Sequence, residues 1–399
     1  MKNNIVLLSS TCSSKHYEYL QSIKTKEKIN PSQKYFYMLI KGLNFIDECE
    51  VTCVSIRSID PSNCNLKKLD YYEDEENGIK FIYPPIVNEK IFKHSRNIKN
   101  VKSICKEIID RNLNKGVNTI FLFDALCFDA CYGGLLAGKK IKKCAVVTDI
   151  PTDIVNIGKG VRYSLLNRLK ARIHNQLFRK YDCFCFLVES MNVINKKDKP
   201  FVLIEGMIDK DVKNPLPNVH NKIVLYAGGI YEKFGLKKLV SASKLVDIPG
   251  FELHIYGEGN LVSYITEIEK VDERIKYLGC LSLSDLFEKE REACLLINTR
   301  PTNERFTKYS FPSKTLEYMS TGRPVMSTKL AGIPSQYFEY LICIEDESEE
   351  GIKKALLSFF NRNTEEINEI GQKTFDYVVK EKNNVKQAMI LWEMLQIRD

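Results

Sequence analysis

The sequence predicts an α/β protein of two domains, each built on a parallel β-sheet covered by helices. Three observations favour this fold class. The 399 residues exceed one ordinary domain, which has roughly 100–200 residues. Short apolar runs alternate with helical patterns along the chain, as they do around parallel sheets. Residues 208–221 are rich in Asp, Lys, Asn and Pro, which indicates a linker between two halves.

The first half contains apolar runs that are nearly continuous, as expected for strands buried on both faces. We predict strands at Ile5–Leu8, Val51–Ile56, Ile79–Tyr83, Thr119–Phe123, Ala145–Thr148, Cys183–Val188 and Phe201–Ile204. A helix is predicted after Asn30, with Pro31 in its first position and Gln33 completing a capping box. From the i, i+3, i+4, i+7 spacing, its buried face consists of Phe36, Leu39, Ile40 and Leu43.

The second half repeats this alternation. Strands are predicted at Ile223–Ala227, Glu252–Tyr256, Ile275–Leu278, Cys294–Asn298, Pro324–Ser327 and Leu341–Ile344. We therefore expect Rossmann-like domains at residues 1–207 and 222–370, joined by a linker at 208–221. Residues 371–399 are expected to form helices that pack back toward the N-terminal domain.

The composition argues against several functional classes. A net charge of +8, spread along the chain, is too mild for a dedicated nucleic-acid binder, so no nucleic-acid partner is predicted. No stretch approaches the ~20 apolar residues needed to cross a bilayer, and no signal-peptide pattern is expected. The thirteen cysteines are therefore expected to be reduced in a cytoplasm. Their spacing lacks paired zinc ligands, and no metal cofactor is predicted.

The segment from residue 298 to residue 325 carries the clearest chemical signal. Arg300 follows a buried strand, and ligands of open α/β sheets bind at the carboxyl ends of strands. Ser310 or Phe311 is predicted to cap the next helix, with Pro312 in its first position. In the first turn, Ser313 and Lys314 would lie beside free backbone N–H groups, which predicts a cradle for a diphosphate.

Glu317 lies three residues beyond Lys314 and hence on the same helix face. A carboxylate there would accept hydrogen bonds from ribose hydroxyls while the lysine meets phosphate. Taken alone, the two residues would also fit an exposed helix with a Lys/Glu ion pair. The strand-end Arg300, the proline and the following Gly322-Arg323-Pro324-Val325 turn favour the binding site.

Several other residues have both a structural and a functional interpretation. Gly228 and Gly229 follow a strand, where they would allow close approach to a ligand or simply form a turn. Asp149 follows another strand and would either bind a substrate hydroxyl or cap the turn before Pro151. No recognisable dyad or ligand pair is predicted among the five histidines, which are His16, His94, His174, His220 and His254.

The pattern Pro-Ser-Lys-x-x-Glu-Tyr-x-x-x-Gly-x-Pro-Val, beginning at Pro312, resembles the donor site of retaining glycosyltransferases of family 4, with the GT-B fold. The bacterial members that build capsular polysaccharide, exopolysaccharide or O-antigen are the most similar. The resemblance extends over most of the chain. It includes Thr148-Asp149-Ile150-Pro151, Glu205-Gly206, Ala227-Gly228-Gly229, Tyr256-Gly257-Glu258-Gly259 and Gly332-Ile333-Pro334.

This resemblance implies two Rossmann-like domains whose parallel sheets face a central cleft, with the donor on the C-terminal domain and the acceptor on the N-terminal one. Glu317 would hold the nucleotide ribose, and Ser313 and Lys314 would face the diphosphate. Tyr309 stands where the family has a first glutamate, which contacts the transferred sugar, so Tyr309 and Ser310 are included in the predicted donor site.

The family's arginine after the first strand of the C-terminal domain is also missing. The stretch there reads Gly228-Gly229-Ile230, and Lys233 matches the accompanying lysine only loosely. Arg300 and Lys314 are therefore expected to neutralise the diphosphate. With Asp149, they are the predicted catalytic residues.

The stretch Arg162–Lys180 combines basic residues with leucines and isoleucine at helical spacing. Such a helix either packs on the core with a solvated basic face or docks on an anionic membrane surface. The second alternative would place the protein on the inner face of the plasma membrane.

Together these features predict transfer, with retention, of a sugar from a UDP- or GDP-sugar to a saccharide or polyprenyl-diphosphate-linked acceptor. Because Tyr309 replaces the glutamate, a non-catalytic, nucleotide-sugar-binding partner subunit is an alternative. A sugar-nucleotide epimerase of similar architecture is another.

Overall fold

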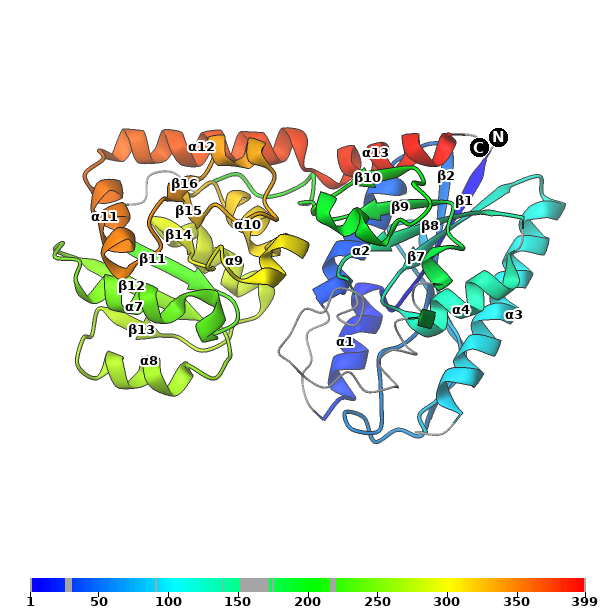
Figure 1. Ribbon diagram of the computed structural model, residues 1–399. Coiled ribbons are helices and arrows are strands. Elements are labelled where there is room, and N and C mark those ends of the chain that lie inside the picture. The colour runs from blue at the N-terminus through cyan, green and yellow to red at the C-terminus, as the bar shows by residue number, and fades with distance from the viewer. Residues whose placement is uncertain are drawn as a thin grey trace. The chain divides into compact units, whose positions relative to one another are not determined.

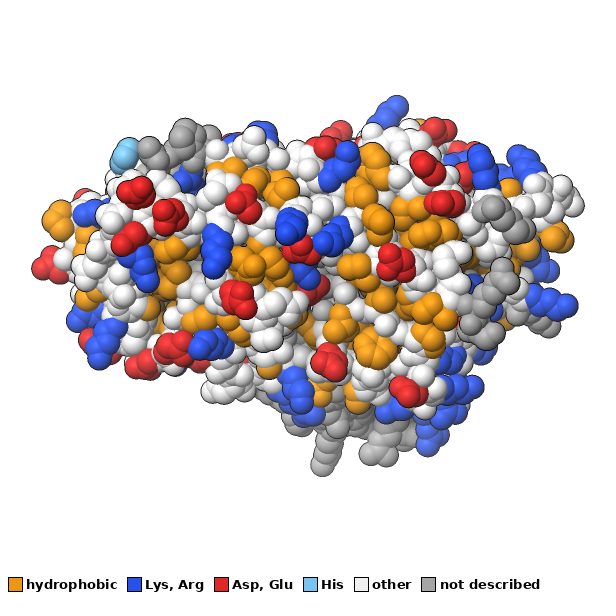
Figure 2. Space-filling model, turned by 90° about the horizontal axis from the view of Figure 1, so that it is seen from above, with side chains coloured by type: hydrophobic (Ala, Val, Ile, Leu, Met, Phe, Trp, Pro, Cys, Tyr) orange, Lys and Arg blue, Asp and Glu red, His pale blue; other side chains and the backbone are white. Residues whose placement is uncertain are grey.

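The computed structural model describes residues 2–25, 31–89, 92–138, 140–150, 172–173, 176–215 and 220–397. The chain divides into two compact units (Figure 1). Unit 1 comprises Met1–Met207 and Asn384–Asp399, and unit 2 comprises Ile208–Asn383. On the face shown in Figure 2, basic and acidic side chains are interspersed among apolar ones.

Unit 1 is built on an eight-stranded sheet in the order β10-β9-β8-β7-β1-β2-β5-β4, parallel except for β4. The predicted strands of this half are confirmed, with small shifts of their ends. The strands are β1 Asn3–Ser9, β2 Cys49–Ser55, β4 Tyr72–Glu76, β5 Ile79–Tyr83, β7 Asn118–Asp124, β8 Lys142–Val147, β9 Cys183–Phe186 and β10 Phe201–Leu203. The short strands β3 (Lys68–Leu69) and β6 (Ile86–Val87) form a separate antiparallel pair.

The antiparallel edge strand β4 was not predicted. Its sequence, Tyr-Glu-Asp-Glu-Glu, has none of the apolar character by which the other strands were recognised. The signal that would have found it is the turn Asn77-Gly78, in which both residues have positive φ. Asn-Gly in this conformation forms the tight turn typical of β-hairpins, and here it joins β4 to β5.

The described helices of unit 1 flank this sheet. They are α1 Ser14–Ser22, α2 Pro31–Leu43, α3 Lys93–Asn114, α4 Phe128–Ala137, the 3-10 helix η1 Glu189–Ile194 and α13 Asn384–Gln396. The predicted buried face of α2 is confirmed, because Phe36, Leu39, Ile40 and Leu43 are all fully buried. The amide of Gln33 bonds both the N–H and the C=O of Cys12, in the loop after β1. Its predicted capping partner, Asn30, lies outside the described residues.

Unit 2 contains a six-stranded, wholly parallel sheet in the order β13-β12-β11-β14-β15-β16. All six predicted strands are confirmed. They are β11 Lys222–Ala227, β12 Phe251–Tyr256, β13 Ile275–Tyr277, β14 Leu295–Asn298, β15 Val325–Thr328 and β16 Ile342–Ile344. Apolar side chains of these strands and of the covering helices form one buried core.

Helices connect the successive strands of unit 2, and the long helix α12 follows the last of them. They are α7 Leu236–Lys244, α8 Val262–Glu269, α9 Leu283–Glu292, α10 Ser313–Met319, α11 Glu349–Phe360 and α12 Thr364–Glu381. Four 3-10 turns occur in the described chain; those of unit 2 are η2 Glu232–Phe234, η3 Arg305–Tyr309 and η4 Ser335–Glu339.

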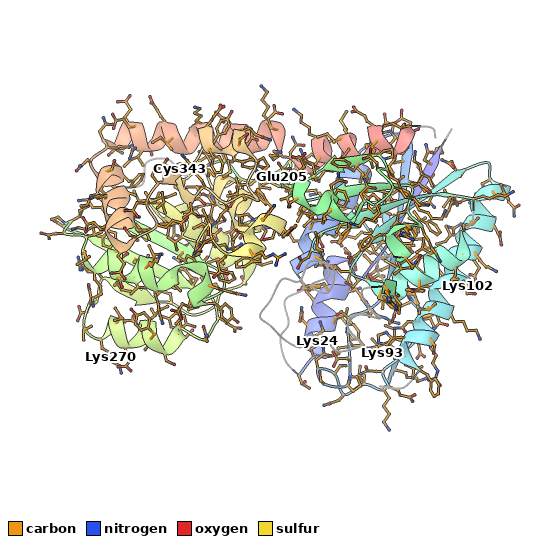
Figure 3. The ribbon with its side chains drawn as sticks, in the orientation of Figure 1. Lys24, Lys93, Lys102, Glu205, Lys270 and Cys343 are labelled. Atoms are coloured by element: carbon orange, nitrogen blue, oxygen red, sulfur yellow. The ribbon has the colours of Figure 1, made fainter. Side chains whose placement is uncertain are left out.

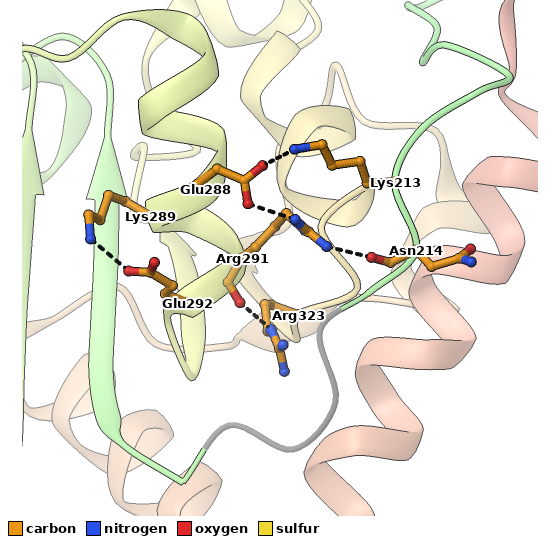
Figure 4. A network of polar contacts seen from close by, with 7 residues as sticks. All are labelled: Lys213, Asn214, Glu288, Lys289, Arg291, Glu292 and Arg323. Carbon is orange, nitrogen blue, oxygen red and sulfur yellow. Dashed lines mark hydrogen bonds and ion pairs between the residues drawn. The ribbon is translucent and has the colours of Figure 1, made fainter.

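The segment that enters unit 2 is held by polar contacts at the amino-terminal edge of the sheet (Figure 4). The Arg291 guanidinium donates to the Asn214 carbonyl at 2.6 Å and pairs with Glu288 at 2.6 Å. Arg323 in turn donates from Nε to the Arg291 carbonyl at 2.7 Å. A side chain on Gly322 would collide with Pro215, so the glycine is required for this packing. The Gly322-Arg323-Pro324 turn therefore fixes the entering chain and lies at the edge opposite the carboxyl ends of the strands.

Candidate functional site

The strand order of unit 2 locates its ligand site. From β11 the chain moves outward through β12 and β13, and then returns to β14 on the other side of β11 before continuing to β15 and β16. Ligands of open parallel sheets bind at such a switch point, outside the carboxyl ends of the two central strands. Gly228 and Arg300 lie just past the ends of β11 and β14. We call this region the unit 2 switch point.

The glycines after β11 are packed against neighbouring loops. Gly228 donates its N–H to the Tyr256 carbonyl at 3.0 Å, and a side chain on Gly257 would meet the Gly228 carbonyl at 1.9 Å. A side chain on Gly229 would meet the Phe234 ring at 2.8 Å. These glycines thus let the connections after β11 and β12 approach closely, and direct contact of Gly228 and Gly229 with a donor stays a prediction.

Helix α10 begins one residue later than predicted. Pro312 occupies the N-cap position and Ser313 is the first helical residue, and no side chain caps the helix. Ser310 is unavailable as a cap because its hydroxyl donates to the Phe306 carbonyl of η3 at 3.1 Å. Ser313 is exposed at the helix start, whereas Phe311 is buried.

Tyr318 fixes α10 against the central strand. Its hydroxyl accepts from the Ala227 N–H at 2.7 Å and donates to the Ala227 carbonyl at 3.1 Å. The ring is fully buried. Because Ala227 ends β11, these two bonds hold the first turns of α10 beside the unit 2 switch point.

Lys314 is held between two carboxylates. Its Nζ lies 2.7 Å from Glu317 Oε1 and 2.9 Å from Oε1 of Glu290, a fully buried residue of α9. Burial alone would lower the pKa of Lys314, but the two carboxylates outweigh it and raise that pKa. The lysine side chain is 23% exposed. Its charge is therefore already matched within the protein, which the sequence did not predict because Glu290 lies 24 positions away.

Two other cations at this edge rest on aromatic rings. The Arg300 guanidinium lies 4.7 Å from the centroid of the Phe234 ring, and Lys233 Nζ lies 5.1 Å from the same centroid. Lys233 is also 5.5 Å from the Phe306 ring. Within the described ranges neither cation forms an ion pair. We call Lys233 and Arg300 the cation pair.

The backbone of Arg300 is fixed on both sides. Its N–H donates to Asn298 Oδ1 at 3.3 Å, and its carbonyl accepts from the Thr328 hydroxyl at 2.6 Å. Burial lowers the pKa of Arg300, although an arginine remains charged at neutral pH. A partly buried, unpaired positive charge is costly, and an anion bound beside it would relieve that cost.

Tyr309, which replaces the family's first glutamate, ends η3 and is half-buried. Lys308 Nζ lies 5.9 Å from its ring centroid. Tyr309 therefore belongs to the same connection as Phe306, between β14 and α10.

Asp149 lies in unit 1, just past the end of β8, and is exposed. Its carboxylate accepts the Ile150 N–H at 2.8 Å. This bond matches the turn-capping interpretation, and a contact with substrate stays a prediction.

The expectation that no histidine belongs to a dyad is wrong. His94 Nδ1 lies 2.8 Å from Asp129 Oδ1, and His254 Nε2 lies 2.7 Å from Glu252 Oε2. No local pattern indicates the first pair, because its members lie in the first turns of two different helices, 35 positions apart. His16 stacks on Tyr83, with ring centroids 3.9 Å apart.

Two features are absent from the part of the chain that the structure describes. No group of three or more His, Cys, Asp or Glu side chains there is placed to hold a metal ion. None of the helices there combines the length and apolar character needed to span a bilayer. Most of the predicted basic helix Arg162–Lys180 lies outside the described residues.

Residues 221–362 match the family model of Glycosyl transferases group 1. No curated protein sequence matches the chain significantly. Solved structures do match, at low sequence identity. The sucrose-phosphate synthase of Thermosynechococcus elongatus has 12% identity and a TM-score of 0.68, with 98% of each chain covered.

Two other solved structures cover almost the whole chain. A trehalose-6-phosphate protein from E. coli, bound with UDP-2-fluoro glucose, has 10% identity and a TM-score of 0.65, over 99% of this chain and 100% of that one. Anabaena HepE, in complex with UDP and glucose, has 12% identity and a TM-score of 0.61, over 100% of each chain. The two-sheet architecture and these structures show the GT-B fold, and within it residues 221–362 match the model of Glycosyl transferases group 1.

Proposed function

We propose that the protein transfers a hexosyl group, with retention, from a nucleotide diphosphate sugar to a saccharide or lipid-linked saccharide. The observation that carries this proposal is the cation pair at the unit 2 switch point, where Lys233 and Arg300 lack carboxylate partners. A diphosphate is the anion that a sugar nucleotide would bring there. UDP or a UDP-sugar is present in two of the structures of similar fold, which favours UDP as the nucleotide.

In this proposal the cation pair stabilises the leaving group. As the glycosidic bond to the diphosphate breaks, negative charge grows on the phosphate oxygens, and preorganised cations lower the energy of that transition state. The backbone of Arg300 is fixed by two hydrogen bonds. Its planar guanidinium can donate hydrogen bonds to two phosphate oxygens at once. Lys233 adds a second charge from η2.

The role that we assign to Lys314 differs from the one expected from the sequence, which was to neutralise the diphosphate. Its ion pairs with Glu317 and Glu290 keep the Glu317 carboxylate in one place beside the unit 2 switch point. Glu317 would there accept hydrogen bonds from the ribose hydroxyls. Ser313, exposed at the start of α10, and Tyr309 are assigned to the donor side of the same site.

The acceptor and the pathway belong to the same proposal. We assign the acceptor to unit 1, with Asp149 as one of its contacts, and infer a surface-polysaccharide substrate from the resemblance of the 312–325 pattern. A lipid-linked acceptor would bring the enzyme to the cytoplasmic face of the plasma membrane.

The experiment is a thermal-shift screen with UDP, GDP and a panel of their sugars, followed by incubation of the binding sugar nucleotide with bacterial lipid extract. Nucleotide release that depends on the extract supports transfer. Conversion of the donor to another sugar nucleotide without extract would identify an epimerase instead. Binding without release or conversion would identify a non-catalytic partner subunit, which the substitution at Tyr309 makes the second candidate. If no nucleotide stabilises the protein, the donor site itself is wrong.

A further inference from the structure

Tyr226 is a buried tyrosine whose hydroxyl has no part in the transfer described above. It is the last residue but one of β11, and its ring is packed in the core of unit 2, with 5% of the residue exposed. Its hydroxyl donates to the carbonyl of Gly229, just past the end of the strand, at 2.8 Å. A buried phenol usually finds one hydrogen-bond partner, and here that partner belongs to the glycine pair at the unit 2 switch point.

Gly229 has an unused backbone donor. Tyr226 holds its carbonyl, but its N–H donates to no acceptor in the described part of the chain. The neighbouring N–H groups of Gly228 and Ile230 are both used, and they donate at 3.0 and 2.8 Å to carbonyls at and just past the end of β12. Gly229 is half-buried. An unpaired backbone N–H in such a place is a donor that an anion can use.

Gly229 lies beside the cation pair. A side chain on Gly229 would meet the Phe234 ring at 2.8 Å, so the glycine backbone packs directly on that ring. The same ring carries both cations, with the Arg300 guanidinium 4.7 Å and Lys233 Nζ 5.1 Å from its centroid. Because β11 and β14 are neighbouring parallel strands, the connections that follow them leave the sheet side by side. The free N–H and the two cations therefore lie where one anion could contact all of them.

The Tyr226 hydroxyl also interacts electrostatically with Arg300. Burial raises the pKa of Tyr226 to about 12, and the positive charge of Arg300 opposes that rise. Burial lowers the pKa of Arg300, and the charge of Tyr226 opposes that change in turn. The phenol is therefore protonated at neutral pH, and it continues to donate to the Gly229 carbonyl beside the cation.

We propose that Tyr226 is a positioning residue of the donor site, which holds the Gly229 carbonyl and thereby directs the free Gly229 N–H to the diphosphate on the cation pair. The backbone dihedrals of glycine are the least restricted of any residue, so a bond that fixes its carbonyl also limits the direction of its N–H. The Gly229 N–H contacts the phosphate, and Tyr226 does not. This inference rests on the proposed function, because the diphosphate is that of the sugar nucleotide.

The first test compares the affinities of the full-length protein for UDP, inorganic pyrophosphate and uridine. Tyr226→Phe keeps the buried ring and removes only the hydroxyl. We expect the affinities for UDP and pyrophosphate to fall about ten-fold, the loss expected for one hydrogen bond to a charged group. The affinity for uridine, which has no phosphate, should stay the same. A merely structural role of the hydroxyl would lower all three affinities.

Tyr277→Phe is the matched control, because it removes a bond of the same kind. The Tyr277 hydroxyl donates to the Gly257 carbonyl at 3.1 Å. Unlike that of Gly229, the N–H of Gly257 is already used, and it donates to the Gly279 carbonyl at 2.8 Å. Tyr277→Phe should therefore bind all three ligands as the parent protein does.

The second test observes Gly229 directly and needs no variant. The sequence contains two Gly-Gly pairs, Gly133-Gly134 and Gly228-Gly229. In protein labelled with ¹³C-carbonyl, ¹⁵N-glycine, an HNCO spectrum shows only N–H groups that follow a glycine, which are those of Gly134 and Gly229. Gly134 lies within α4 of unit 1 and serves as the internal reference. Pyrophosphate should shift the Gly229 signal and leave that of Gly134 in place.

The outcomes separate this inference from the proposed function. Failure of the parent protein to bind either UDP or pyrophosphate would refute the donor site itself. Pyrophosphate binding that leaves the Gly229 signal unmoved would overturn only the role of its N–H and of Tyr226. The same holds if Tyr226→Phe binds pyrophosphate as tightly as Tyr277→Phe does, or loses uridine affinity by the same factor.

Discussion

The two switch points of the molecule have the same architecture and opposite chemistry. At the end of β11 and β14, two cations rest on aromatic rings without a carboxylate partner. At the end of β1 and β7, a buried carboxylate is already engaged by a histidine and an asparagine. The first region is suited to an anion, whereas the carboxylate of the second is already matched by neighbouring side chains. The parallel sheet thus fixes where ligands bind, while the side chains at the strand ends decide which ligands.

A second contrast lies within unit 2. Lys314 and Arg300 are both cations near the same strand ends, but Lys314 is matched by two carboxylates and Arg300 by none among the described residues. A cation that is already paired contributes to the folded structure, whereas an unpaired one is ready for a ligand.

Removing the Lys314 ammonium should mainly affect stability. In Lys314→Ala, Glu290 would remain fully buried without its cation, and breaking a buried ion pair typically costs about 3–5 kcal/mol. The free energy of unfolding, measured by urea denaturation, should fall accordingly. Adding Glu290→Gln should recover part of the loss, because a neutral amide is less costly to bury. A Lys314→Ala protein of unchanged stability would show that the pair with Glu290 is not formed.

Removing the cation pair should mainly affect donor binding. Each charge-assisted hydrogen bond contributes about 1.5–3 kcal/mol, so Lys233→Ala with Arg300→Ala should weaken UDP binding by about 100-fold or more in calorimetry. Lys270→Ala is the control: it removes an exposed lysine that follows α8 (Figure 3), away from the carboxyl edge of the sheet. If the double variant binds UDP as tightly as the control does, the diphosphate lies elsewhere.

A Glu317 variant should separate the contribution of the ribose to UDP affinity from that of the diphosphate. In Glu317→Gln the carboxylate acceptor for ribose hydroxyls is lost, and UDP affinity should fall by about ten-fold. Inorganic pyrophosphate has no ribose, so its affinity should be unchanged in this variant and reduced in the cation-pair variant. Equal losses for both ligands would contradict the ribose assignment.

A buried carboxyl at the end of β7 should give unit 1 a pH-dependent stability. Burial raises the pKa of Asp124 to about 7, against an ordinary value near 3.9. Between these values the folded state binds more protons than the unfolded state, so its stability falls as the pH rises from about 4 to about 7. The melting temperature of the parent protein should therefore decrease relative to Asp124→Asn over this range. A constant difference would mean that Asp124 does not titrate there.

Most of the fold could be predicted because local sequence signals agree with it. Strands buried on both faces appear as apolar runs, and the face of α2 follows from its helical spacing. The edge strand β4 was not predicted, because its acidic residues are largely exposed and it pairs with β5 alone. The turn Asn77-Gly78 indicates this hairpin, whereas the residues of β4 show no strand pattern.

The candidate site was only partly predictable, for a different reason. The position of Arg300 follows from the rule for strand ends, and the helix start at Ser313 was missed by one residue. The partners that define each side chain's state come from elsewhere in the chain: Glu290 for Lys314, Phe234 for Arg300 and Asp129 for His94. No local pattern connects these residues, because the fold alone brings them together.

The most direct measurement is a crystal structure of the protein with UDP. We expect the phosphate oxygens to lie within hydrogen-bond distance of the Arg300 guanidinium and the Lys233 ammonium, while Lys314 keeps its ion pairs with Glu290 and Glu317. A diphosphate bound to Lys314, with those ion pairs broken and the cation pair unoccupied, would contradict this expectation.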